Sequence, residues 1–242
     1  MWLSSLVTEG KLLQKQLDRI GSLRSKVIIE RQRDVKEAHP ATFDWLLEEN
    51  PDDDESATPN SFLRWLRCQD GIYWVSGKAG SGKSTSMKFL CGHEKALIAL
   101  QIWAEDKMLL TSSYFFWHAG TGMQKSQQGL LQTLLFNVLK QCPVLIQDVL
   151  PLRWSNPGAA KEGWSRLELL RAFKTQREQP LDSTRFCFFI DGLDEYDGEH
   201  TDVIEIIKSA ASSSATGDSE TGLYEMAFTD TKISRSKHLS KR

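Results

Sequence analysis

Two stretches of the sequence have the residue types and spacing of a phosphate-binding site. The first fits the pattern G-x-x-x-x-G-K-[ST] at every position and consists of Gly77, Lys78, Ala79, Gly80, Ser81, Gly82, Lys83, Ser84 and Thr85. The glycines let the backbone curl so that its N–H groups point at phosphate oxygens. The helix expected next presents its positive end to the same anion. The run predicts a nucleoside triphosphate site.

Three side chains of this run have separate expected roles. Lys83 is long enough to reach the β- and γ-phosphates, so we expect it to take part in catalysis as well as binding. The hydroxyl of Ser84 has the right length to ligate Mg²⁺, and Thr85 lies where it would contact the α-phosphate. The pattern therefore predicts ATP or GTP bound together with Mg²⁺.

The second stretch is an acidic turn at residues 191–195, directly after the apolar run 186–190. An acid at the carboxyl end of a buried parallel strand lies in the crevice where α/β proteins bind ligands. We expect Asp191 to complete the Mg²⁺ shell with Ser84. Asp194 or Glu195 would orient or deprotonate the attacking water, and the sequence leaves the choice between them open.

Other residues that could take part in chemistry give weaker signals. His118 follows the apolar run 114–117, where it would either approach the γ-phosphate or be an ordinary loop histidine. The acidic stretch 48–55 contains proline and almost nothing apolar, which predicts a solvated loop rather than a metal site. The cysteines form no C-x-x-C pair, so we expect reduced thiols at Cys68, Cys91, Cys142 and Cys187.

The elements that position these residues alternate between strands and helices. Short apolar runs predict buried strands, and apolar side chains at three- and four-residue spacing predict helices. This alternation predicts an α/β fold with a parallel sheet. The expected strands are 72–75, 114–117 and 186–190, and the expected helices are 84–90, 94–103, 126–141, 165–179 and one that begins near 201.

Composition limits the possible classes of protein. The 242 residues are 40% hydrophobic and 26% charged, which excludes a wholly disordered or fibrous chain. The formal net charge of −2 provides no general attraction for nucleic acid or for an anionic membrane. No run approaches the roughly 20 apolar residues that span a bilayer. We expect no nucleic-acid partner, no membrane span and a cytoplasmic location.

The N-terminal segment predicts an amphipathic helix, because apolar residues recur at mostly helical spacing from Leu6 to Ile28 with basic residues between them. Its apolar face would pack on the main domain, self-associate or meet a partner. The charge changes sign near residues 39–40, which indicates a domain boundary.

Four stretches, taken in order, resemble a known family. They are residues 37–46, 71–90, 114–135 (YFFWHAGTGMQKSQQGLLQTLL) and 186–198 (FCFFIDGLDEYDG). Together they resemble the NACHT-type nucleotide-binding domain of the STAND class, especially in fungal NOD-like proteins, and the nephrocystin-3-like N-terminal domain. The resemblance implies a P-loop NTPase with a three-layer αβα sandwich, preceded by an N-terminal helical segment.

The resemblance also implies a function. Such a domain is a signalling switch that binds ATP or GTP with Mg²⁺, hydrolyses it slowly and changes oligomeric state, with itself or with related NACHT proteins. Residues 31–39 would lie near the base of the nucleotide. The implied domains are a helical segment at 1–38, a NACHT-like domain at 39–214 and a divergent, disordered tail at 215–242.

The sequence departs from the family pattern after residue 214. The family places a sensor strand between the strand before the phosphate loop and the strand before Asp191, and that strand normally ends in Arg-Pro. No Arg-Pro follows here. Either residues 223–228 or residues 231–234 replace the strand, or the core has a gap at its centre. We therefore expect a C-terminally truncated family member with an incomplete fold.

Two other functions remain open at this stage. A truncated, non-hydrolysing interaction module or decoy would bind longer relatives through the N-terminal helix or shared faces. A P-loop kinase would use the same phosphate loop, but the sequence contains no recognisable lid or acceptor-substrate motif.

Overall fold

A computed structural model of the chain describes residues 2–25, 31–39, 42–48, 62–68, 71–156, 158, 162–178, 184–211 and 224–230. The acidic stretch 48–55 lies outside these residues except for Glu48, and so do Val27 and Ile28 of the amphipathic pattern. The structural findings below concern the described residues.

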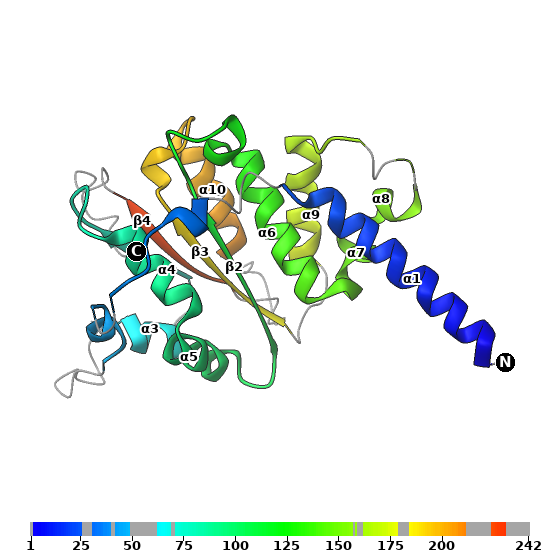
Figure 1. Cartoon of the computed structure of the whole chain (residues 1–242), viewed down its shortest axis with the longest axis horizontal. Helices are drawn as coiled ribbons and strands as arrows, with labels where there is room; N and C mark the ends of the chain where they lie inside the picture. The colour runs from blue at the N-terminus through cyan, green and yellow to red at the C-terminus, as the bar shows by residue number, and fades with distance from the viewer. Residues whose placement is uncertain are drawn as a thin grey trace.

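The centre of the protein is a four-stranded parallel sheet (Figure 1). Its strands are β1 (Gly71–Ser76), β2 (Met108–Phe115), β3 (Thr184–Asp191) and β4 (Tyr224–Asp230), in the order β1-β4-β3-β2. All three neighbouring pairs are parallel. The carboxyl ends of the strands therefore meet at one edge of the sheet, where the residues after β1 and β3 come together.

Strand β3 contributes side chains to two apolar cores, one on each face of the sheet. Every residue of β3 is buried, because helices cover both faces of the sheet. Phe186, Phe188 and Ile190 belong to one apolar cluster, whereas Cys187 and Phe189 belong to the other. This alternation is the period of two that a strand imposes on its side chains.

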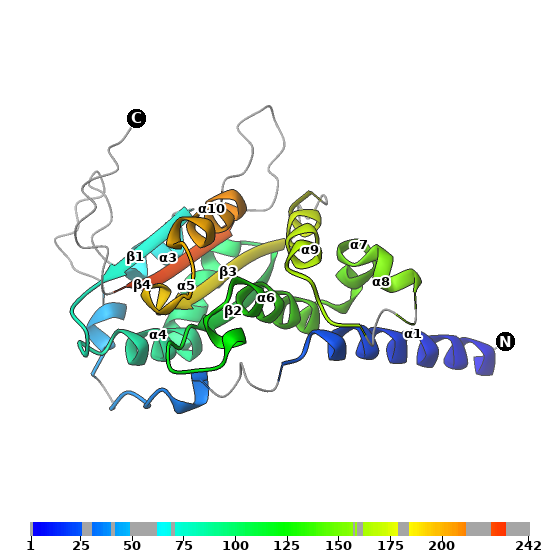
Figure 2. The same ribbon diagram turned by 90° about the horizontal axis from the view of Figure 1, so that it is seen from above.

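Helices lie on both faces of the sheet, as Figure 2 shows from above. Helices α4 and α5 pack with β3 residues Cys187 and Phe189, and α3 packs against α5. Helices α6, α9 and α10 contribute to the opposite cluster. The prediction of an α/β fold with a parallel sheet is confirmed. These helices are α3 (Phe62–Cys68), α4 (Lys83–Gly92), α5 (Glu94–Ala104), α6 (Gln127–Gln141), α9 (Arg166–Glu178) and α10 (His200–Ala211).

Short elements connect the main ones. They are η1 (Asp44–Leu47), η2 (Gly122–Lys125), η3 (Pro143–Leu145), α7 (Ile146–Val149), α8 (Pro151–Ser155) and η5 (Leu193–Glu195). Within the described ranges, no single helix is long and apolar enough to cross a membrane. One pair passes that test jointly, Gln127–Gln141 with Pro143–Val149, but it is bent by 118°.

Strand β4 resolves the question of the missing strand. It lies between β1 and β3, with Tyr73 opposite Ala227 and Phe188 opposite Met226. The first alternative, residues 223–228, is therefore the one that fills the centre of the sheet. This finding corrects the expectation of a disordered tail at 215–242, because Tyr224–Asp230 belongs to the sheet.

Most predicted elements occur within two residues of the expected positions, and β2 is the exception. We predicted a strand at 114–117, whereas β2 covers Met108–Phe115. The polar residues Thr111, Ser112 and Ser113 interrupt β2, so its apolar residues form two short runs, and the pattern revealed only the second.

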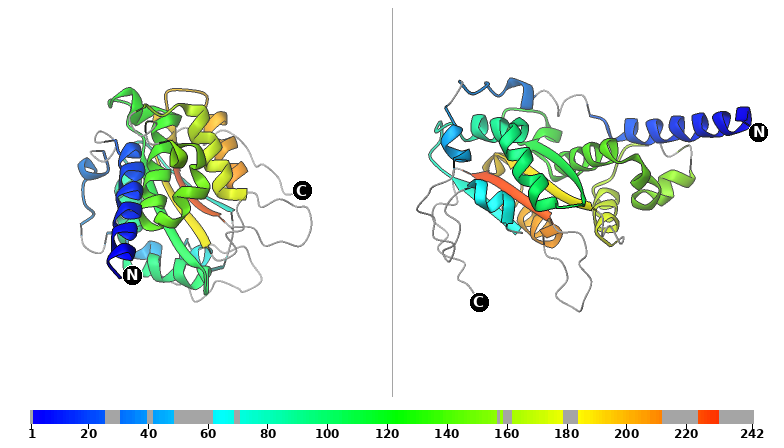
Figure 3. Two further views of the ribbon diagram at one scale, coloured as in Figure 1. Left: turned by 90° about the vertical axis from the view of Figure 1, so that its right-hand side faces the viewer. Right: turned by 90° about the horizontal axis from the view of Figure 1, so that it is seen from below.

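The N-terminal helix α1 (Trp2–Leu23) packs on the rest of the protein through its C-terminal part, from Lys15 and Gln16 onward. There Ile20 and Leu23 join the apolar cluster of α6, and the buried Arg19 donates from Nε to the carbonyl oxygen of Arg153 at 2.6 Å. Trp164 donates to the carbonyl oxygen of Ser22 at 2.9 Å. The rest of α1 extends away from the body of the protein (Figure 3). Packing on the main domain is thus confirmed for one end of the helix.

Candidate functional site: a phosphate loop facing an acidic turn

The phosphate loop connects β1 to α4, as the sequence predicted. Gly80 and Gly82 have φ angles of 75° and 87°, in the left-handed region that side chains with a Cβ rarely adopt. Gly82 is the N-cap of α4, and its carbonyl oxygen accepts from the N–H of Ser86 at 2.8 Å. The loop therefore turns sharply into the helix and directs the positive end of α4 at its own concave side.

Lys83 is held across the loop by the main chain. Its Nζ donates to the carbonyl oxygens of Gly77 at 2.9 Å and of Lys78 at 2.8 Å. The ammonium group is thus positioned among loop atoms rather than extended into solvent. Lys78 itself contributes only its carbonyl oxygen to this contact, and its side chain is exposed.

The acidic turn begins at the carboxyl end of β3. Asp191 is 1% exposed, and a carboxylate is costly to bury unless it is paired or hydrogen-bonded. Gly192 follows with φ 71°, and a Cβ at this position would lie 3.3 Å from the carbonyl oxygen of Phe116. Glycine therefore allows the chain to turn against the end of β2 and begin η5, which carries Asp194 and Glu195.

A main-chain group orients Glu195. The N–H of His118 donates to Glu195 Oε2 at 2.8 Å, and the N–H of Glu195 donates to the carbonyl oxygen of Gly192 at 2.8 Å. These bonds connect the loop after β2 to the turn after β3. Glu195 therefore has a defined direction at the carboxyl edge of the sheet.

The phosphate loop and the acidic turn line the same cavity, with a volume of about 370 Å³. This is at the lower end of the range for small-molecule sites. The loop and the first turn of α4 line one side, and the residues after β3 line the other. The lining residues are Ala79, Gly80, Gly82, Lys83, Ser84, Thr85, Asp191, Gly192, Asp194 and Glu195.

The remaining predicted residues lie close to this cavity without lining it. Gly77, Lys78 and Ser81 belong to the same loop, and the N–H of Ser81 donates to the carbonyl oxygen of Lys78 at 3.2 Å. His118 is exposed, and the structure uses its main-chain N–H rather than its imidazole. The main-chain contact of His118 with Glu195 was not among the predictions, which considered only its imidazole near the γ-phosphate or an ordinary loop histidine.

A half-buried cysteine, Cys91, lies near Asp191 of this cavity. Burial raises the pKa of the Cys91 thiol above its ordinary value, the nearby Asp191 carboxylate raises this pKa further, and a hydrogen bond with the Ser113 side chain opposes the shift. In the described part of the chain, no group of three or more His, Cys, Asp and Glu residues is placed to hold a metal ion. A metal in this cavity would need additional oxygen ligands, such as phosphates.

Sequence reasoning missed two supports of the site. The ring of Phe43 packs close to Gly82, where an added Cβ would lie 3.4 Å from Phe43 Cζ. The same ring lies near Phe89, with 5.9 Å between the ring centroids. On α4, Lys88 forms an ion pair with Glu37 at 2.8 Å and donates to the carbonyl oxygen of Val35 at 2.7 Å. Segments before the sheet therefore brace the helix of the phosphate loop. Residues 37–46 belong to a stretch of family resemblance, but the sequence did not indicate this supporting role.

One known family model covers both the phosphate loop and the acidic turn. A family model described as Nephrocystin 3, N-terminal, matches residues 42–219. The chain belongs to the nephrocystin 3 N-terminal family. The part that matches this family includes the phosphate loop and the acidic turn, whereas α1 and β4 lie outside it. No curated protein and no solved structure is similar enough to the chain to count as a match.

Proposed function

We propose that the chain is a nucleotide-binding signalling switch of the NACHT type, in the STAND class. It would bind ATP or GTP with Mg²⁺ and hydrolyse it slowly. The observation that carries this proposal is the single cavity lined by both the phosphate loop and the acidic turn. Either stretch alone has ordinary structural explanations, but a cationic loop that faces a buried carboxylate across one cavity suits a magnesium triphosphate.

The residues present fit a triphosphate. The left-handed Gly80 and Gly82 place no side chain at two positions that line the cavity, and the start of α4 directs its positive end there. Among the described residues, the ammonium group of Lys83 contacts loop carbonyl oxygens and no carboxylate. On binding, its Nζ would exchange these carbonyl oxygens for β- and γ-phosphate oxygens, which are stronger acceptors.

The residues present also fit Mg²⁺ when phosphates are bound. Ser84 and Asp191 line the cavity from opposite sides and would hold the ion, which neutralises charge on the phosphates. Glu195 is our choice for the residue that orients the attacking water, because the His118 N–H fixes the direction of its carboxylate. Asp194 lines the same cavity and is the alternative.

A second candidate function is an interaction module that does not depend on hydrolysis. Apolar side chains along α1 are about half exposed, at Leu6, Val7, Leu12, Leu13 and Leu17. Such side chains favour contact with another copy or with a related protein. This role predicts that assembly, measured by analytical ultracentrifugation, is unchanged in Lys83→Ala. Loss of assembly in that variant would tie association to the nucleotide.

Thermal unfolding with and without Mg²⁺-ATP or Mg²⁺-GTP tests the leading proposal. At 100 times its dissociation constant, a ligand adds about 2.7 kcal/mol of stability. We expect this gain in the wild type and in the control Lys78→Ala, whose exposed side chain lies in the same loop, and no gain in Lys83→Ala. Equal stabilisation of Lys83→Ala would remove the assigned site, and the preferred nucleotide is the one that gives the larger shift.

A further inference from the structure

The outer edge of β2 has main-chain groups that the sheet does not use. β2 is an edge strand, paired only with β3. The N–H of Phe116 donates to the carbonyl oxygen of Asp191, so even-numbered residues of β2 direct their main-chain groups toward β3. Odd-numbered residues therefore direct theirs outward, along the free edge.

Side chains and a loop satisfy this edge at both ends but not in the middle. At Thr111, the Gln141 side chain accepts from the N–H at 3.3 Å and donates to the carbonyl oxygen at 2.6 Å. Beyond the strand, the N–H of Trp117 donates to the carbonyl oxygen of Gln124 at 3.1 Å. Between these points, the outward N–H and C=O groups of Ser113 and Phe115 bond to no other described residue. Among the described residues, the strand edge at Ser113 and Phe115 is thus open for pairing.

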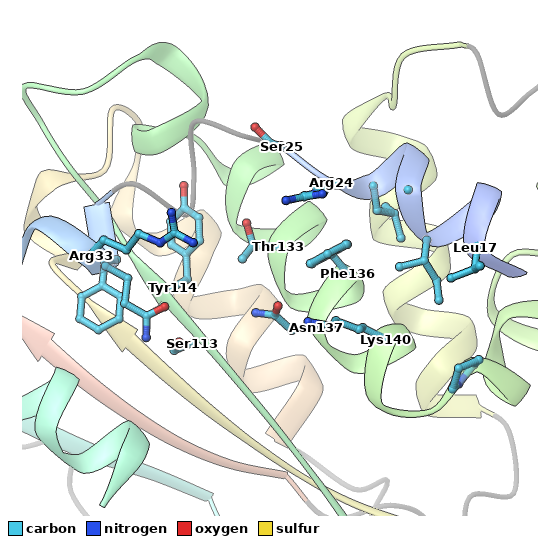
Figure 4. A pocket seen from close by; sticks show the side chains of 16 residues that line it. Leu17, Arg24, Ser25, Arg33, Ser113, Tyr114, Thr133, Phe136, Asn137 and Lys140 are labelled. Carbon is cyan, nitrogen blue, oxygen red and sulfur yellow. The ribbon is translucent and has the colours of Figure 1, made fainter.

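The open edge forms one wall of a groove (Figure 4). Its main cavity has a volume of about 660 Å³ and lies between the end of α1, helix α6 and β2. An adjoining cavity of about 360 Å³ shares Gln32, Ser113, Asn137 and Lys140 with the first, so the groove is elongated. Leu17 and Phe136 give it apolar surface. An elongated groove beside a strand edge has the form that an extended peptide occupies.

The charged side chains that line the groove are all positive. Arg24, Arg33 and Lys140 line it, and no acidic residue is among the described residues that do. These three side chains form no ion pair with any described residue. The whole chain carries a net charge of −2, so this concentration of cations is local. It favours an anionic occupant.

We propose that this groove binds an acidic peptide segment of a partner protein in extended conformation, as an added strand beside β2. The peptide main chain would pair with the outward groups of Ser113 and Phe115. Alternate side chains of a strand point the same way, so acidic residues at every second position would face Arg24, Arg33 and Lys140 together. A compact anion would meet the cations but leave the strand edge unpaired, and for that reason we favour a peptide. This interaction is separate from the nucleotide cavity.

Fluorescence anisotropy with a labelled synthetic peptide, TEVEVET, tests the proposal on the full chain. We expect saturable binding that weakens as salt rises. A copy with N-methyl groups on alternate residues keeps the charge and loses main-chain donors, and a copy with Lys in place of Glu reverses the charge. Both should bind at least tenfold more weakly. Equal affinity of the N-methylated peptide would assign the groove to anions in general and overturn the proposal.

Matched protein variants locate the site. Arg24→Glu with Lys140→Glu should reduce affinity at least tenfold, whereas Arg171→Glu with Lys174→Glu makes the same charge change on the exposed face of α9 and should have a much smaller effect. Circular dichroism confirms that both variants fold. Hydrogen exchange should also slow at the Ser113 and Phe115 amides when peptide is bound. Unchanged exchange at both amides, or equal loss of affinity in the two variants, would overturn the proposal.

Discussion

The two cavities beside the sheet differ in how the chain builds them. The proposed nucleotide cavity lies at the carboxyl edge, where its described lining comes from two short runs of the chain, 79–85 and 191–195. The groove beside β2 collects residues from α1, from the segment 31–39, from the strand and from α6. The first cavity presents main-chain N–H groups and buried acid, whereas the second presents exposed cations and a free strand edge.

This difference separates two kinds of binding site. Local backbone geometry forms the proposed nucleotide cavity, so a motif in the sequence is enough to predict it. The groove exists only because α1, α6 and β2 pack side by side, and none of these segments contains a motif of its own. Substitutions in the core and at each cavity can show whether the two sites respond together or separately.

The largest effect should come from Phe188→Ala, which removes a fully buried ring from β3 and should affect both sites. Phe188 lies opposite Ser112 in β2 and belongs to the apolar cluster that includes α6, whereas its strand ends at Asp191 of the proposed nucleotide cavity. We expect a loss of about 3–5 kcal/mol in the free energy of unfolding, measured with urea. Leu152→Ala is the control, because this side chain is 79% exposed. A similar loss in both variants would contradict the assigned core.

Glu195→Gln should separate hydrolysis from binding. The substitution keeps an acceptor for the His118 N–H but removes the basic carboxylate, so we expect turnover of ATP or GTP to fall about 100-fold with affinity little changed. Single-turnover assays measure both quantities. If Asp194→Asn has the larger effect on turnover, the roles of the two acids are reversed.

Asp191→Asn should affect the nucleotide cavity and leave the groove intact. We expect Mg²⁺-dependent nucleotide affinity to weaken about tenfold, or about 1.4 kcal/mol, because the amide is a poorer ligand for Mg²⁺. Isothermal titration with and without Mg²⁺ measures this loss. Binding of TEVEVET should stay within twofold of the wild type. A parallel loss at the groove would mean that the two sites are coupled.

Gly82→Ala should strain the phosphate loop by about 1 kcal/mol, because a Cβ is unfavourable at φ 87° and would lie 3.4 Å from Phe43. Gly10→Ala makes the same change in α1, where no heavy atom lies within 4 Å, and should stabilise the helix slightly. Thermal unfolding compares them. Equal midpoints would show that the left-handed turn is not required.

The smallest effect concerns pH and the Cys91 thiol, which lies between the two sites. Cys91 lines the smaller groove cavity and lies near Asp191, and burial raises its pKa above the ordinary 9.0. Because the unfolded chain loses this proton first, the stabilisation is present below about pH 9 and is lost as pH rises through the folded pKa. We expect the urea midpoint to fall above pH 9, and less so in Cys91→Ala. Burial also raises the pKa of Tyr114, which adds a similar loss above about pH 10 in both proteins.

The sequence predicted most elements of the fold because their patterns are local. Helix α6 has leucines at helical spacing and Pro143 after its end, and β3 is an apolar run bounded by charge. The start of β2 was placed six residues too late, because Thr111, Ser112 and Ser113 separate its first apolar residues from the apolar run that begins at Tyr114. The pattern for α1 could not distinguish its anchored end from its exposed leucines, since both have the same spacing.

The sequence by itself determined the phosphate loop, the acidic turn and the parallel α/β class, because consecutive residues specify a turn, a helix start and a buried strand. Only the tertiary structure decided that β4 fills the centre of the sheet, that the His118 N–H orients Glu195, and that cations gather beside the free edge of β2. Each of these depends on contacts between segments far apart in the chain. Their geometry follows from how helices and strands pack, and no local pattern encodes it.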